Sequence, residues 1–161
     1  ERANADAGEA QEATKKAPRF PVSVLAALEV AVVTDDLPGG LRVLAWARLL
    51  KVYGTMRTGD LQRIVQSNVT MGEVGWTAKL LRTKTTGSGK KVRELRAFIP
   101  RGASLAGVEW LSKGHQLWND MVPRGTDFLL PRLSADASFF VPKVATSSDL
   151  DGLCKRVLVE L

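Results

Sequence analysis

The sequence predicts an α+β fold that is mainly helical and contains a small antiparallel β-hairpin. Two observations predict it. Several segments carry apolar residues at helical spacing, and two shorter segments on either side of a Gly- and Ser-rich turn have the composition of paired strands. The chain has 161 residues, 45% of them apolar, which is enough for one domain with a real core.

Residues 1–18 are rich in Ala and charged side chains and lack large apolar groups, so we expect a disordered or linker arm. Residues 19–161 then form the domain. The first helix, 22–33, is mostly apolar and follows Pro21. The next, 41–53, is apolar almost all round, which indicates a central core helix that ends at Gly54.

Arg57 stands between this core helix and a short helix for which Thr58 is the expected N-cap and Asp60 lies in the first turn. The free amides of a helix start favour an anion, and a guanidinium offers planar donors that fit phosphate oxygens. The alternative is a structural ion pair with a carboxylate such as Glu29 or Asp60.

The segments 76–83 and 92–99 are expected to be strands joined by the basic turn 84–91. A helix is expected over 104–118, with core candidates Leu105, Val108, Leu111 and Trp118.

Residues 123–146 contain three prolines and should be mostly irregular. The last segment, 147–161, is an amphipathic helix with Ser147 or Ser148 as its cap. No C-terminal helix signal follows, so we expect the domain to be truncated there.

The net charge of +6 is concentrated in one segment. Between residues 82 and 101, a single acid, Glu94, faces seven basic residues: Arg82, Lys84, Lys90, Lys91, Arg93, Arg96 and Arg101. A local basic stripe in a neutral body is typical of a surface that binds a polyanion such as double-stranded DNA. The alternative is a solvated hairpin face.

Other classes of protein are disfavoured. No apolar run approaches 18 residues and no signal peptide is visible, so we expect no membrane partner. The single cysteine, Cys154, suggests a reducing compartment, and with one histidine, His115, a metal site is not expected. The four tryptophans are expected to pack in the core rather than to stack on bases.

Two stretches, LLKVYGTMRTGDLQRI (49–64) and LLRTKTTGSGKKVRELRAFIP (80–100), resemble the first half of a tyrosine recombinase (phage integrase family) catalytic domain. The pattern around the first catalytic arginine of that family is matched by Gly54, Met56 in a position usually held by Leu, Arg57, Asp60 and Leu61. The hairpin lysine of the family, often found as RTKT, is matched by Lys84.

This resemblance implies DNA recombination or integration, the breaking and rejoining of DNA through a phosphotyrosyl link, with a mobile element as source. Arg57 would hold the scissile phosphate and Lys84 would protonate the leaving 5′-hydroxyl. Asp60 and Gly54 would support the arginine turn, and Arg82, Lys90, Lys91, Arg93 and Arg96 would contact DNA. The family needs no metal or nucleotide cofactor, acts in the nucleus or nucleoid, and implies a homo-oligomer on DNA for a full-length form.

The chain departs from the family in its second half. His115 is followed three residues later by Trp118 where the family has His-x-x-Arg, and the only tyrosine, Tyr53, precedes Arg57 instead of coming last. The chain is therefore a fragment or a degenerate relic and should not cut DNA alone. The alternatives are a catalytically inactive DNA-binding module and a helical protein-interaction domain with a basic face.

Overall fold

The structure, a computed structural model, describes residues 21–81, 83, 88–89, 92 and 94–160. Its helices are α1 (Val22–Val33), α2 (Gly39–Tyr53), α3 (Thr58–Gln62), the 3-10 turn η1 (Gln66–Asn68), α4 (Trp110–Met121) and α5 (Ser147–Glu160). Its strands are β1 (Val69–Met71), β2 (Gly75–Leu80), β3 (Leu95–Pro100), β4 (Pro131–Leu133) and β5 (Phe140–Val144). The predicted arm 1–18 and most of the turn 84–91 lie outside the described residues.

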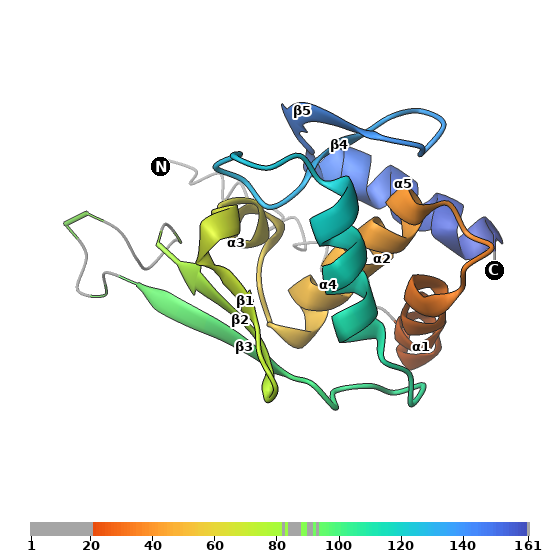
Figure 1. The fold of residues 1–161 in the computed structure, drawn as a ribbon, viewed down its shortest axis with the longest axis horizontal. Coiled ribbons are helices and arrows are strands. Elements are labelled where there is room, and N and C mark those ends of the chain that lie inside the picture. Colours follow the sequence, from red (N-terminus) through yellow and green to blue (C-terminus); the bar gives the residue numbers. More distant parts are fainter. Residues whose placement is uncertain (1–20, 82, 84–87, 90–91, 93, 161) are drawn as a thin grey trace, which may run out of the picture.

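Helix α2 is the centre of the fold, as its apolar character predicts. It packs against α1, α4 and α5, and the end of the helix leads into α3. The antiparallel sheet β1–β2–β3 extends to the lower left in Figure 1, and the β4–β5 ribbon lies at the top beside α5. The coarse prediction of a mainly helical α+β fold with a small antiparallel sheet is confirmed.

The helices at 22–33 and 147–160 are confirmed, and α2 begins two residues before the predicted 41–53. The cap of α5 is corrected. Thr146 is the capping residue: its hydroxyl accepts the N–H of Asp149 at 3.1 Å, and its own N–H donates to the Asp149 carboxylate at 2.9 Å.

The helix predicted over 104–118 is wrong over residues 104–109, because α4 begins at Trp110 and runs to Met121. Leu105, expected in the core, is 51% exposed. The physical reason is the buried Glu29 carboxylate of α1, which accepts the backbone N–H groups of Leu105 and Ala106 and so keeps this segment as a loop.

The two strands predicted at 76–83 and 92–99 are present as β2 and β3, with bounds 75–80 and 95–100, and the sheet gains a three-residue strand, β1, that was not predicted. The expectation that 123–146 is mostly irregular is confirmed, although the short strands β4 and β5 within it were not predicted. These strands form a two-stranded ribbon, in which every strand is an edge and so tolerates proline.

All four tryptophans are buried, as expected, and three of them meet near α2. Trp46 of α2 packs edge-on against Trp76 of β2, with ring centroids 6.4 Å apart, and lies 5.8 Å from Trp118 of α4. Gly114 of α4 allows this approach: a Cβ at that position would lie 2.1 Å from Cδ1 of Trp46.

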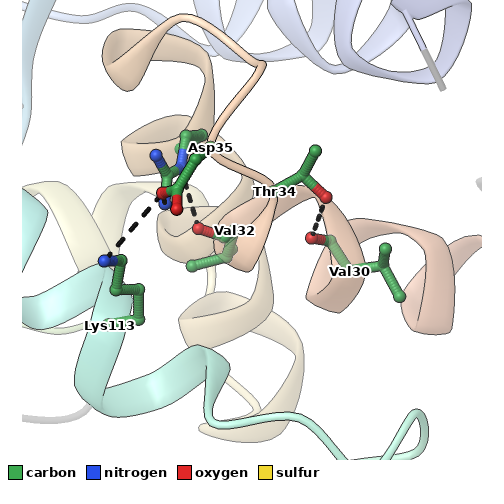
Figure 2. Close-up of polar contacts among 6 residues, drawn as sticks. Val30, Val32, Thr34, Asp35 and Lys113 are labelled. Carbon is green, nitrogen blue, oxygen red and sulfur yellow. Dashed lines mark hydrogen bonds and ion pairs between the residues drawn. The ribbon is translucent and has the colours of Figure 1, made fainter.

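A polar cluster fixes the turn between α1 and α2. The buried Arg42 donates from Nε to the carbonyl of Val32 at 3.0 Å and pairs with Asp35 at 2.8 Å. Figure 2 shows Lys113 of α4 reaching the same carboxylate, at 4.0 Å, and the Thr34 hydroxyl donating to the carbonyl of Val30. The end of α1 is thereby tied to α2 and α4.

The Gly114→Ala substitution should lower the free energy of unfolding by about 1–3 kcal/mol, because the new methyl group overlaps Trp46. The matched control is Gly152→Ala in α5, where a Cβ meets nothing within 4 Å. That control should raise the free energy of unfolding by up to about 1 kcal/mol. Urea unfolding of both variants checks this, and equal stabilities would contradict the packing described for Trp46.

Candidate nucleic-acid interface

The chain turns sharply after α2, and this turn sets the direction of Arg57. The N–H of Thr55 donates to the carbonyl of Val52 at 3.1 Å, and the N–H of Met56 donates to the carbonyl of Lys51 at 2.9 Å. These two bonds form a Schellman motif. The helix ends at Gly54, as predicted, and the left-handed residue of the motif is Thr55, with φ 51°.

Gly54 is nonetheless required in the turn. A Cβ there would lie 2.8 Å from the carbonyl oxygen of Leu50 and 2.7 Å from Cε of Met56. Met56 is buried against the core, whereas Arg57, the next residue, is exposed. The turn therefore buries one side chain and directs the following guanidinium outwards.

Arg57 itself is the N-cap residue of α3, which corrects the assignment of Thr58. The Asp60 carboxylate accepts the backbone N–H of Arg57 at 3.3 Å, so Asp60 braces the turn through the main chain. Because α3 is a single turn of five residues, a helix dipole adds little to any anion site here.

Gln62, which sequence reasoning missed, fixes α3 to the C-terminal half of the domain. Its buried amide donates to the carbonyl of Ala145 at 2.8 Å and accepts the N–H of Leu130 at 3.2 Å. A glutamine on a short helix gives no sequence signal for such a long-range contact. The result is that the Arg57 turn is held from both sides.

Arg57 lines a pocket of about 340 Å³ together with residues from the base of the β2–β3 hairpin. These hairpin residues are Leu80, Thr83, Leu95, Arg96 and Ala97. In the described part of the chain, no carboxylate forms an ion pair with the Arg57 guanidinium. Glu29 is engaged elsewhere and Asp60 binds only the backbone, which removes the two structural partners considered for Arg57.

The exposed face of the sheet carries two like charges directly opposite each other. Lys79 of β2 is paired in register with Arg96 of β3, and the next pair on this face is Thr77 with Phe98. Arg96 has one acidic neighbour, Glu94, at 3.5 Å, and Phe98 is 50% exposed. Like charges facing each other across strands destabilise a sheet.

Lys84, Arg82, Lys90, Lys91 and Arg93 lie outside the described residues, so their predicted roles stay predictions. Thr83, the residue before Lys84, lines the pocket that contains Arg57. Of the predicted DNA-contacting residues, the structure therefore describes Arg57 and Arg96, and it brings both to the same pocket.

Tyr53 is half-buried and is held by a hydrogen bond to the core. Its hydroxyl donates to the Glu29 carboxylate, and its ring stacks on Trp110 with centroids 5.2 Å apart. Burial and the neighbouring Glu29 raise the pKa of Tyr53 far above its usual value. Tyr53 is therefore a packed core residue, as its place on an apolar helix indicates.

Glu29 accepts hydrogen bonds from the Ser104 hydroxyl at 2.7 Å and from the N–H groups of Leu105 and Ala106 at 2.9 and 2.8 Å, in addition to that of Tyr53. Burial alone would raise the pKa of Glu29, but these hydrogen bonds outweigh it and hold the pKa below the ordinary value. Glu29 is therefore a buried, ionised structural carboxylate.

The ring of His115 packs against those of Trp46 and Trp118, with centroids 6.1 and 5.5 Å away. Burial, and then the charge of Arg124, lower its pKa, so it is neutral near pH 7. Within the described ranges, no group of three His, Cys, Asp or Glu residues is placed to hold a metal ion, and no helix has the length and apolarity to cross a membrane. The side chain of Cys154 is not described.

Replacing Glu29 by Gln should lower the free energy of unfolding at pH 7 by about 3 kcal/mol, since an amide donor then faces backbone donors. The folded-state pKa of Glu29 is lowered, so its contribution is present above the unfolded value near 4.5 and lost as the pH falls through the folded value. The Glu29→Gln variant should not show this loss of stability as the pH falls. Urea unfolding from pH 3 to pH 7 measures both effects.

Glu73→Gln is the matched control, because Glu73 is exposed and makes the same change of charge. It should leave the stability and its dependence on pH unchanged. A Glu29→Gln variant as stable as the control would contradict the account of this carboxylate.

Comparisons with models of protein families, with curated proteins and with solved structures found no match to this chain. The resemblance to tyrosine recombinases therefore rests on the residues around Arg57 and Lys84 and stays a prediction. What the geometry adds is that Arg57 and the base of the basic hairpin meet at one pocket, beside a sheet face with two opposed cations.

Proposed function

We propose that the domain binds double-stranded DNA through the exposed face of β2 and β3 and the adjoining Arg57 turn. The observation that carries this proposal is the cross-strand pair of Lys79 and Arg96. Two cations opposite each other cost stability in the free protein, and a phosphate between them relieves the repulsion. The basic segment 82–101 continues the same charge along the hairpin.

Arg57 is proposed as the residue that holds one particular phosphate. It projects from a turn that is fixed by a Schellman motif, by the Asp60 brace and by the Gln62 anchor, so its backbone position is set before DNA arrives. Such preorganisation lowers the ordering cost of binding. Its tyrosine-recombinase-like place supports the same role, with Lys84 as the proposed partner.

Cleavage by this chain alone is not part of the proposal. Phosphotyrosyl chemistry needs a tyrosine that reaches the phosphate, and the single tyrosine of the sequence donates its hydroxyl to buried Glu29. DNA binding, with the recombinase nucleophile absent from the chain, is therefore the function proposed for these residues. The chain would act where DNA is, in the nucleus or nucleoid.

Lys79→Gln and Arg96→Gln should each weaken binding to a short duplex and reduce the slope of log affinity against log salt by about one, the loss of one phosphate contact. Lys79→Gln should also raise the free energy of unfolding without DNA by about 0.2–1 kcal/mol, because a like-charge pair is removed. Fluorescence anisotropy over a range of salt concentrations and urea unfolding measure the two effects.

Lys155→Gln on α5 is the control, since Lys155 is exposed and far along the chain from the sheet. It should leave the salt slope near that of the wild type. Absence of duplex binding even at low salt would contradict the proposal and favour an acidic protein partner for the basic face.

Incubation of the chain with nicked or supercoiled duplex should give no covalent protein–DNA adduct, because Tyr53 is half-buried and its hydroxyl donates to Glu29. Denaturing electrophoresis of the labelled duplex detects such an adduct. A Tyr53→Phe variant shows whether any adduct depends on the Tyr53 hydroxyl. An adduct that forms with the wild type and disappears with this variant would overturn the assignment of Tyr53 as a core residue.

A further inference from the structure

A second basic pocket, of about 560 Å³, lies between the β4–β5 ribbon and one face of α5. Figure 1 shows this ribbon and α5 at the upper right, away from the three-stranded sheet that carries the proposed DNA face. A volume of this size is in the range of small-ligand sites. The pocket is separate from the one that contains Arg57, since the two have no lining residue in common.

Three cations from three different elements line this pocket. They are Arg132 of β4, Lys143 of β5 and Arg156 of α5. One carboxylate opposes them: Asp149, which pairs with Arg132 at 3.3 Å and is also the capping partner of Thr146. Arg156 donates from Nη1 to the carbonyl of Ala135 at 2.7 Å, which orients its guanidinium. The pocket therefore has an excess of positive charge.

Lys143 reaches this face through an irregularity in the ribbon. Arg132 pairs with Val141 and Pro131 pairs with Val144, so Pro142 and Lys143 have no cross-strand partners. A bulge of this kind re-aims the side chains that it contains. Lys143 is exposed, and no acidic partner for it is found among the residues that the structure describes.

The helix face opposite the ribbon contains a glycine that packing does not explain. Ser148, Gly152 and Arg156 are four residues apart along α5 and line the pocket together. A glycine inside a helix costs about 1 kcal/mol relative to alanine. At Gly114 in α4 that cost is offset, because the absence of a side chain lets Trp46 pack against the helix. At Gly152 no such contact exists, since a Cβ there would meet nothing within 4 Å. The missing side chain leaves open space between the cations.

We propose that this pocket binds a phosphate group, with Arg132, Lys143 and Arg156 as its cationic ligands. The proposal is independent of DNA binding by the sheet. The phosphate belongs either to a small phosphate ester or to a nucleic-acid backbone, because the same three side chains recognise both.

The test uses the whole chain and two variants that fill the same space with different chemistry. Gly152→Glu places a carboxylate among the cations, and Gly152→Ala is the matched control, which adds only a methyl group. Inorganic phosphate is titrated at constant ionic strength while amide chemical shifts are followed by NMR. Wild type and Gly152→Ala should show saturable shifts at Ser134, Ser148 and Gly152 or its substitute. Gly152→Glu should bind at least about tenfold more weakly.

Arg156→Ala is the second variant, which removes a cation without adding a charge, and it should also weaken phosphate binding about tenfold. Amide spectra of both variants report whether they are folded. No saturable shifts in the wild type, or equal affinities for wild type, Gly152→Glu and Arg156→Ala, would overturn the proposal.

A duplex titration then distinguishes the two sources of the phosphate. If Gly152→Glu also weakens duplex binding, the phosphate belongs to a nucleic-acid backbone. If duplex affinity is unchanged while phosphate binding is lost, the ligand is a small phosphate ester. The sheet variants Lys79→Gln and Arg96→Gln should not alter phosphate binding at this pocket. The phosphate titration therefore tests this proposal even if the sheet does not bind DNA.

Discussion

The carboxylate of Glu29 is buried where α1, the last turn of α2 and the loop before α4 meet, and it accepts hydrogen bonds from the last two. A buried charge is tolerated only when it is well satisfied, so this one group fixes how the three segments meet. It also fixes the end of α2 through Tyr53. The Schellman turn that aims Arg57 outwards begins one residue later, so the geometry of the candidate interface depends on a carboxylate in the core.

The charged groups of the interior and those of the sheet surface have different surroundings. In the core, the Glu29 carboxylate accepts hydrogen bonds from neutral donors. Arg42, at the turn between α1 and α2, donates to a backbone carbonyl and pairs with a carboxylate. On the sheet, Lys79 and Arg96 face each other across the strands, with one exposed carboxylate beside them. Like charges opposite each other in a sheet cost stability, which the Glu94 carboxylate beside Arg96 offsets in part. The proposed DNA ligand would relieve the rest of this repulsion.

Sequence patterns predicted the elements whose own residues carry the signal. The apolar runs of α1 and α2 and the amphipathic α5 follow from periodicity, and the hairpin follows from its composition. The errors share a cause in contacts that are distant along the chain. The loop at 104–109 is kept from helix by Glu29, some 75 residues earlier, and β4 with β5 forms in a proline-containing segment because a ribbon has only edges. The local pattern predicts Arg57 at the start of a short helix, but the anchoring of that helix by Gln62 and the opposed position of Lys79 depend on tertiary structure.

The central claim is that the face of β2 and β3 beside Arg57 is the surface that meets DNA. Amide chemical-shift mapping of the isotopically labelled chain with a short duplex tests it most directly. The account predicts that the largest shifts at low salt fall on Thr77–Leu80, on Leu95–Phe98 and on the turn at Arg57, and that they fade as salt is added. Shifts confined to α1 or α4, or no shifts at any salt concentration, would contradict it.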